Sequence, residues 1–357
     1  MSLLVRVAIP VAVLLATWWL TGRMRRYALA QRLLDIPNAR SSHAVPTPRA
    51  GGVAIVLATL AAFLTAGCLR LLPWPIVLGL AGSGALVAGI GFMDDRRHVA
   101  RRWRLATHIA AATWILWFLG GLPPLAAVGT VFDLGWAGHA LAALYLVWLV
   151  NLTNFMDGID GIAAVETITV SVGAVCIYAL TPGADDLWLA PTVLAAACLG
   201  FLVWNWPPAK IFMGDAGSGF IGLILGGLSL QAAWTAPTLL WSWVILLGVF
   251  VVDATTTLIH RGIRGVRLHD AHRTHAYQHA AQRWLAHAPV TWAVAAINVL
   301  WLLPCAVLVA RHVLDGPAGV IVAYLPLVAA AVRLGAGRPQ PLHSVRGVPT
   351  YNQTPDS

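Results

Sequence analysis

The chain contains 357 residues, of which 59% are hydrophobic and 10% are charged, and its formal net charge is +9. Soluble domains carry roughly 25% charged residues, so this composition cannot cover a globule of 38.0 kDa with water-facing side chains. It excludes a soluble enzyme, a disordered scaffold and a secreted disulfide-rich module. The four cysteines lie inside apolar runs without metal-like spacing, as small buried hydrophobic residues do. The sequence therefore predicts an all-α, polytopic integral membrane protein.

Apolar runs predict about eleven transmembrane helices, since about 20 apolar residues cross the hydrocarbon core of a bilayer. The first run is read as a retained helix and not as a cleaved signal peptide, because its basic flank follows the apolar stretch and no small-residue cleavage site is evident. His108 and His139, inside two of the weaker runs, are interpreted as helix-packing residues with satisfied hydrogen bonds. The predicted spans are 3–21, 51–69, 71–93, 105–122, 134–150, 161–180, 187–206, 217–234, 237–259, 290–310 and 317–333.

The basic residues indicate an orientation for these spans. When the loops are assigned to alternating sides, 20 of the 23 Lys and Arg residues fall on one side, which the positive-inside rule makes cytoplasmic. The opposite side keeps only Arg6, Arg70 and Arg311. We predict a single transmembrane domain over 1–338, with a disordered cytoplasmic tail over 339–357.

The acidic residues gather at the same predicted membrane face. Ionisable groups near helix ends in a membrane protein are costly and usually belong to a pathway or a site. The pair Asp94 and Asp95 closes the third run, and two adjacent carboxylates need a metal ion, an arginine or a proton beside them. The alternative for this pair is a solvated helix end paired with its own arginines.

The densest polar run of the chain is Asn151-Leu-Thr-Asn154-Phe-Met-Asp157-Gly-Ile-Asp160-Gly. Three-residue spacing would place its four oxygen-bearing side chains near one stripe if the run is helical. Amide and carboxylate oxygens suit a hard cation such as Mg²⁺. The alternative is a capped turn between two helices.

A second polar run, Phe212-Met-Gly-Asp215-Ala-Gly-Ser218-Gly, precedes a predicted helix. Its glycines and Ser218 could bind phosphate at the helix N-terminus, and Asp215 could join a metal shell. The alternative is an ordinary N-cap at Asp215 or Ser218.

Two further loops on this face carry candidate phosphate contacts. The first, over 40–52, contains Thr47 with hydroxyls, arginines and a glycine pair, and it could instead be only a basic flank. The second, over 260–289, combines histidine and arginine around His272, Arg273 and His275, which suits phosphoryl oxygens. The alternative for this second loop is a solvated basic segment near anionic lipid. Oxygen ligands and arginines together favour phosphoryl transfer, and the membrane setting implies a lipid substrate.

With these motifs the chain resembles the polyprenyl-phosphate N-acetylhexosamine-1-phosphate transferases, glycosyltransferase family 4. The likeness covers roughly residues 35–280 in five ordered blocks: Pro-Thr-Pro-Arg…Gly-Gly, Gly-Phe-Met-Asp-Asp, Asn-x-x-Asn-x-x-Asp-Gly-x-Asp-Gly, Phe-Met-Gly-Asp-x-Gly-Ser and His-Arg-x-His-Ala-Tyr-Gln. The last block is most similar to the O-antigen (lipopolysaccharide) subgroup. The histidine triplet of the phospho-MurNAc-pentapeptide enzymes is absent.

The resemblance implies transfer of a sugar 1-phosphate from a UDP-N-acetylhexosamine to undecaprenyl phosphate, with release of UMP. It implies that 1–338 is a transferase domain in the bacterial inner membrane with its active site facing the cytoplasm. It also implies Mg²⁺, replaceable by Mn²⁺, a bilayer setting, no nucleic acid, and a homodimer as one option. Direct attack and a covalent aspartyl intermediate both stay open, as does the sugar. The implied metal ligands are Asn154 and Asp215, the catalytic carboxylates are Asp94, Asp95, Asp157 and Asp160, and the substrate-binding residues are Thr47, Arg104, Asn151, Phe212, His272, Arg273 and His275.

Three positions depart from the family pattern: Ala50 stands for a third glycine, Thr274 for a serine and Arg104 for a lysine. A rival interpretation is an ion- or proton-coupled transporter. It would place charges near the bilayer midplane and show paired repeats, neither of which the sequence indicates. A third, a non-catalytic membrane scaffold, leaves the acidic clusters without a purpose.

Overall fold

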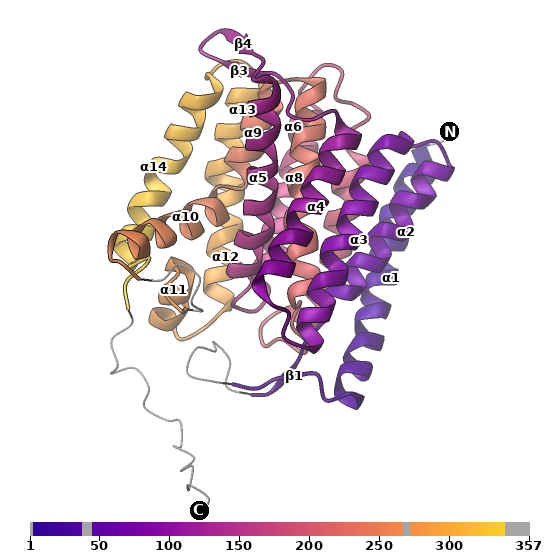
Figure 1. Ribbon diagram of the computed structural model, residues 1–357, viewed down its shortest axis with the longest axis vertical. Coiled ribbons are helices and arrows are strands. Elements are labelled where there is room, and N and C mark those ends of the chain that lie inside the picture. Colours follow the sequence, from indigo (N-terminus) through magenta and orange to yellow (C-terminus); the bar gives the residue numbers. More distant parts are fainter. Residues whose placement is uncertain (1–2, 38–44, 267–271, 340–357) are drawn as a thin grey trace, which may run out of the picture.

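The computed structural model describes residues 3–37, 45–266 and 272–339, and it forms a bundle of helices (Figure 1). Most of the helices run along the long axis of the molecule, and two-stranded hairpins lie at its two ends. The hairpin at one end pairs β1 (Leu34–Asp35) with β2 (Thr47–Pro48), and the hairpin at the other end pairs β3 (Leu125–Ala127) with β4 (Thr130–Phe132). The helices are α1 (Leu3–Ala30), α2 (Gly52–Cys68), α3 (Trp74–Arg96), α4 (Arg101–Leu119), α5 (Gly135–Met156), α6 (Ile162–Tyr178), α7 (Leu189–Asn205), α8 (Asp215–Thr235), α9 (Thr238–Leu246), α10 (Gly248–Ile263), α11 (Ala276–Trp284), α12 (Ala288–Ile297), the π-helix η1 (Asn298–Leu302), α13 (Leu303–Ala310) and α14 (Gly316–Leu334).

All eleven predicted spans contain helix, but the described helices do not all qualify as spans. Six are long and apolar enough to cross a membrane, or seven if the bent pair α9 and α10 counts as one span. The apolar helices α2, α6 and α7 have 17 residues each and are shorter than that. The polytopic helical character therefore holds, whereas the count of eleven stays a prediction. The predicted tail lies, apart from Pro339, outside the described residues.

Helix α8 lies at the centre of the bundle, and almost all of its side chains are buried. Glycines let its neighbours approach closely, as is common between helices in membranes. A Cβ atom on Gly52 of α2 would lie 2.4 Å from the Cα atom of Gly217, and one on Gly91 of α3 would lie 2.5 Å from the carbonyl oxygen of Asp215. These contacts hold the ends of α2 and α3 against the first turn of α8.

The predicted span 237–259 is broken, because α9 and α10 meet at an angle of 70°. A break leaves the first N–H groups of the new helix without partners inside that helix. The carboxylate of Glu166 accepts the backbone N–H of Phe250 in the first turn of α10. Asn298, the first residue of η1, donates to the same carboxylate over 2.7 Å. The only glutamate of the chain therefore fastens the start of α10 to α6 and η1 inside the bundle.

Candidate active site

Four helix ends meet at one end of the bundle and bring polar side chains together. Asp94 lies in the last turn of α3, Arg104 in the first turn of α4, Asn154 in the last turn of α5 and Asp215 at the start of α8. These residues are far apart in the sequence, and each comes from a motif or position that the sequence singled out.

Arg104 connects the two carboxylates of this cluster. Its Nη1 lies 2.5 Å from Oδ2 of Asp94 and 3.5 Å from Oδ2 of Asp215. The other oxygen of Asp94 accepts the backbone N–H of Val99 over 2.7 Å. Asp94 and Asp215 also lie within hydrogen-bonding distance of each other. For Asp94, the required positive charge is thus supplied by an arginine of the next helix.

Asn154 links α5 to the first turn of α8. Its amide nitrogen donates to Oδ1 of Asp215 over 2.8 Å and to the hydroxyl of Ser218 over 3.0 Å. The amide oxygen accepts no hydrogen bond from the described residues. Asn154 and Asp215 are therefore close enough to share one ion, and the amide oxygen is open to a further partner.

Asp95 has a different position from its neighbour Asp94. Its side chain is buried, and its carboxylate accepts the backbone N–H groups of Asp215 and Ala216 over 3.0 and 3.2 Å. These donors would otherwise be unpaired at the helix start, so Asp95 caps α8 from another helix. Gly214 precedes them with φ +77°, and a Cβ there would lie 2.7 Å from the carboxylate. The alternative interpretation, an ordinary N-cap at Asp215 or Ser218, is therefore wrong, since the N-cap position is Gly214.

The polar run over 151–161 does not form one helical stripe. Helix α5 ends at Met156, so Asn151 and Asn154 lie on the helix and Asp157 follows its last residue. Asp160 lies in the next turn, where it accepts the backbone N–H of Ala209 over 3.1 Å. Asp160 therefore supports the loop before α8 from the side.

Asp157 faces other acidic groups at the centre of the site. Burial raises its pKa well above the ordinary value of 3.8, and the negative charges of Asp215, Asp95 and Asp160 raise it further. A carboxyl group in this setting holds a proton more readily than one in water.

The loop that carries Thr47 packs against the segment before α8. The N–H groups of Gly51 and Gly52 donate to the carbonyl oxygens of Phe212 and Met213 over 2.9 and 2.8 Å. The buried Thr47 hydroxyl donates to the carbonyl oxygen of Val45. In this structure the loop fixes the position of Phe212, and its glycine N–H groups have partners within the chain. The phosphate contacts predicted over 40–43 belong to the segment 38–44, which lies outside the described residues.

The block that contains His272, Arg273 and His275 is attached to α10 and α5. The buried His275 ring lies 3.2 Å from a carboxylate oxygen of Asp253, which also accepts the N–H groups of Ala276 and Tyr277. His275 thus positions the start of α11. His272 stacks on it at 5.0 Å. Burial, together with His275 and Arg261, lowers the pKa of His272 to about 4, so it is neutral at pH 7.

Arg273 lines a separate opening of about 470 Å³, whose walls include Asp160, Pro207, Pro208 and His287. Its guanidinium Nε has no hydrogen-bond partner among the described residues. This arginine is the member of the block best placed to meet an anion.

A narrow cavity of about 10 Å³ lies between Arg104, Asn151, Asn154 and Asp215. That volume is close to that of one water-sized sphere. Among the described residues no three His, Cys, Asp or Glu side chains form a metal cluster. The carboxylates of Asp94 and Asp215 and the amide oxygen of Asn154 still form a set of hard oxygen donors. This set fits Mg²⁺, which retains several waters and takes few protein ligands.

Several site residues escaped the sequence analysis. Tyr277 donates its hydroxyl to the carbonyl oxygen of Phe155 over 2.9 Å and so joins two motifs. His287 pairs with Asp160 over 3.2 Å. His108, which the sequence predicts to be a packing residue with satisfied hydrogen bonds, is buried and lines the narrow cavity. Its Nδ1 has no hydrogen-bond partner among the described residues, which differs from that prediction. His139 accepts the N–H of Leu122, as expected of a packing residue.

A family model described as glycosyl transferase family 4 matches residues 77–233, which include Asp94, Asn154 and Asp215. The chain is also 35% identical over 265 residues to the phospho-N-acetylmuramoyl-pentapeptide-transferase of Streptomyces coelicolor, covering 60% of this chain and 71% of that protein. This chain belongs to glycosyl transferase family 4.

Other relatives are named for polyprenyl phosphates. The decaprenyl-phosphate N-acetylglucosaminephosphotransferase of Mycolicibacterium smegmatis is 33% identical over 274 residues, covering 68% of this chain and 66% of that protein. A probable undecaprenyl-phosphate N-acetylglucosaminyl 1-phosphate transferase of Bacillus subtilis is 27% identical over 280 residues, covering 77% and 76%. The match to the Mycobacterium tuberculosis decaprenyl enzyme spans 58% of that protein's length.

Proposed function

We propose that this protein transfers N-acetylglucosamine 1-phosphate, or a closely related N-acetylhexosamine 1-phosphate, from a UDP-sugar to undecaprenyl phosphate and releases UMP. The observation that carries the proposal is the contact of Asp94, Arg104, Asn154 and Asp215 at the ends of four helices. The names of the mycobacterial and Bacillus relatives support the lipid and the sugar.

The oxygen donors of the site support Mg²⁺ as the cofactor. Asp215 and Asn154 would hold it with Asp94 nearby, and the bound ion would supply positive charge to the diphosphate of the donor. Mn²⁺, which favours the same oxygen ligands, would substitute.

The chain's own residues would bind and align the two substrates. A phosphate oxygen of the lipid would form a bond to the sugar-bearing phosphorus, and the bond from that phosphorus to the UMP oxygen would break. A phosphate monoester is mostly dianionic at pH 7 and needs no base. Both oxygens of Asp94 already accept hydrogen bonds, which favours an orienting role and direct attack over a covalent aspartyl intermediate. Arg104 would bind the phosphate, while Asp157 and Phe212 would hold the uridine.

In this proposal the site lies at the cytoplasmic face of a bacterial inner membrane. Nucleotide sugars are made on that side of the membrane. The segregation of the basic residues supports this side. The product would initiate a cell-surface glycan of the O-antigen class, in line with the His-Arg-Thr-His-Ala-Tyr-Gln block over 272–278.

The test is a reaction in nanodiscs that contain purified protein, undecaprenyl phosphate, Mg²⁺ and a panel of UDP-N-acetylhexosamines. We expect UMP and a lipid diphosphate sugar in equal amounts, and loss of both when the metal is chelated. Asp215→Asn should lower turnover by at least about 10²-fold, as is typical for loss of one charged group that acts on the transition state.

The matched control is Asp186→Asn. Asp186 is exposed and pairs with Arg6 over 2.7 Å, away from the site, so this variant should keep full activity. Absence of UMP with every donor, from protein shown to be folded, would contradict the proposal. Full activity of Asp215→Asn would contradict the metal assignment.

A further inference from the structure

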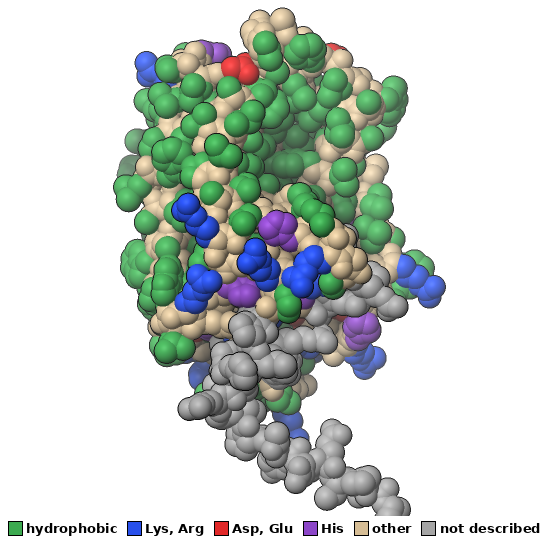
Figure 2. Space-filling model, turned by 90° about the vertical axis from the view of Figure 1, so that its left-hand side faces the viewer, with side chains coloured by type: hydrophobic (Ala, Val, Ile, Leu, Met, Phe, Trp, Pro, Cys, Tyr) green, Lys and Arg blue, Asp and Glu red, His purple; other side chains and the backbone are tan. Residues whose placement is uncertain are grey.

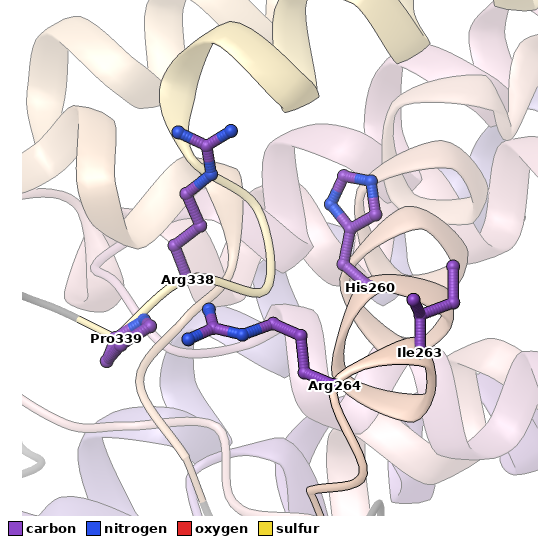
Figure 3. Close-up of a pocket in the computed structure, with 5 residues that line it drawn as sticks. All are labelled: His260, Ile263, Arg264, Arg338 and Pro339. Carbon is purple, nitrogen blue, oxygen red and sulfur yellow. The ribbon is translucent and has the colours of Figure 1, made fainter.

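A basic cavity lies at the end of α10, on the face that α10, α11 and α14 form. Its volume is about 530 Å³, and it is lined by His260, Ile263, Arg264, Arg338 and Pro339 (Figure 3). No carboxylate of the described residues lines it. None of the described acidic residues forms an ion pair with Arg264 or Arg338 either.

The segment after α14 is folded so that it brings Arg338 to α10. Gly335 and Gly337 have φ of +95° and +76°, a region that favours glycine. The N–H of Gly337 donates to the carbonyl oxygen of Thr274 over 2.8 Å. A Cβ on Gly337 would lie 2.6 Å from the Cβ of His260 and 2.9 Å from the carbonyl oxygen of Thr257. The position of Arg338 is therefore set by backbone geometry.

The α10 side of the cavity is tied to the same segment. The Nδ1 of His260 lies 2.9 Å from the carbonyl oxygen of Ala336 and donates to it, which leaves Nε2 free of this contact. The guanidinium of Arg264 donates to the carbonyl oxygen of Gly337 over 3.5 Å. Figure 3 shows Arg264 and His260 projecting from α10 beside the segment of Arg338 and Pro339.

Apolar side chains lie beside the basic residues on α10. Ile263, which lines the cavity, is 80% exposed, and Ile259, one turn earlier, is 55% exposed. Figure 2 shows basic and histidine side chains in the lower half of this face and apolar side chains above them. This order, charge beside a broad apolar surface, is that of a protein surface at the headgroup level of a bilayer.

We propose that the cavity binds the phosphate headgroup of an anionic phospholipid. Two guanidinium groups suit phosphate oxygens. The exposed isoleucines would contact the first methylenes of the acyl chains. A phosphate dissolved in water would make only the charged contacts. The apolar surface is therefore the feature that favours a lipid over a free phosphate, and the site lies apart from the cluster of Asp94 and Asp215.

The experiment measures lipid binding and does not depend on the transferase reaction. Delipidated full-length protein is titrated with dioleoylphosphatidylglycerol or dioleoylphosphatidylcholine, and bound lipid is counted by native mass spectrometry. We expect preferential retention of phosphatidylglycerol. Arg264→Gln combined with Arg338→Gln should weaken its affinity about tenfold or more and leave phosphatidylcholine unchanged. The matched control, Arg70→Gln with Arg311→Gln, removes two exposed arginines at the other end of the bundle and should change neither affinity.

A second variant moves a charge without removing it. Gly337→Ala should displace Arg338 and weaken phosphatidylglycerol binding several-fold at unchanged net charge. The control is Gly183→Ala. Gly183 has a similar φ of +80°, but no atom lies within 4 Å of the Cβ that alanine would add. Unchanged phosphatidylglycerol affinity in the double arginine variant would overturn the proposal. Displacement of the lipid by an equal concentration of glycerol 3-phosphate would overturn the choice of a lipid.

Discussion

Arg104 lies between Asp94 and Asp215, whose carboxylates would otherwise repel each other across the end of the bundle. In the proposed reaction this guanidinium has two functions. It neutralises the carboxylates before substrate binds, and it meets the phosphate of the incoming lipid. Both contacts are made by the same nitrogen, Nη1, so an ammonium group, which has three donors, can provide the same charge at this position.

This reasoning gives a graded prediction for Arg104. Arg104→Gln should lower kcat/KM by about 10²-fold or more, because the phosphate contact and the neutralising charge are both lost. Arg104→Lys should keep most of the activity, since the charge remains. Equal losses in the two variants, measured as UMP release, would show that the charge is not the property that matters. Arg102→Gln, an exposed position on the same helix, is the control.

Asp157 makes the stability of the protein depend on pH. Its pKa in the folded protein is raised well above 3.8, first by burial and then by the charges of Asp215, Asp95 and Asp160. Between pH 3.8 and this raised pKa, the folded state therefore holds a proton here that the unfolded chain has released. The free energy of unfolding consequently falls as pH rises through this range.

We expect Asp157→Asn to remove this dependence. The amide does not titrate, so the variant should lose less stability than the wild type between pH 4 and pH 8. The measurement is the unfolding temperature in detergent across that range. An identical pH profile in the two proteins would show that Asp157 is ionised without penalty.

The sequence singles out residues that meet in the candidate site better than it predicts the partners of each residue. Asn154 donates its amide N–H to Asp215, so these two predicted residues lie together, whereas an ion shared between them stays a prediction. The position of Asp95 could not be predicted, because its partners are backbone N–H groups that any sequence contains. The same holds for Asp160, which binds the N–H of Ala209 and the ring of His287.

Among the elements, α8 depends most on close approach by its neighbours. Gly91 of α3 faces the carbonyl of Asp215 at a distance that leaves no room for a methyl group. Two residues earlier, Gly89 has no atom within 4 Å of its Cβ position. The two glycines share one helix and differ only in what they face.

This pair tests whether the packing of α3 on α8 sets the geometry of the site. Gly91→Ala should push Asp94 and Asp95 away from Asp215, lowering UMP release at least about tenfold and reducing thermal stability. Gly89→Ala should have almost no effect on either quantity. Full activity of Gly91→Ala would mean that the helix ends can move apart without cost to the reaction.

The break between α9 and α10 shows what periodicity cannot predict. The run 237–259 is apolar throughout most of its length, and no proline interrupts it between 238 and 259. The stabilising partner of the break, Glu166, belongs to α6 and is distant in the sequence. An apolar run therefore predicts helix here, but it does not predict where the helix axis turns.

For the whole molecule, composition was enough to predict a helical membrane protein, and all eleven apolar ranges contain helix. Helices of 17 residues are shorter than the full hydrocarbon thickness, so length alone does not decide the number of spans. The distribution of Arg and Lys carries independent information about orientation, because it depends on loops and not on helix length.

Orientation gives a prediction for intact cells. In a background with the exposed Cys68 and Cys176 replaced by serine, a cysteine at Asp186 should react with a membrane-impermeant thiol reagent added outside the inner membrane. A cysteine at Arg101 should react only after the membrane is permeabilised. The opposite pattern would place the site on the wrong side for cytoplasmic nucleotide sugars.

The cap that Asp95 places on α8 has a consequence for how the protein is made. The two partners are separated by 120 positions, so the first turn of α8 has no acceptor of its own when it leaves the ribosome. These N–H groups gain an acceptor only when α8 packs beside α3, which is synthesised and inserted much earlier. The candidate active site should therefore assemble late in folding. A chain expressed as two fragments, divided between α3 and α8, should be inactive until the fragments reassemble in the bilayer.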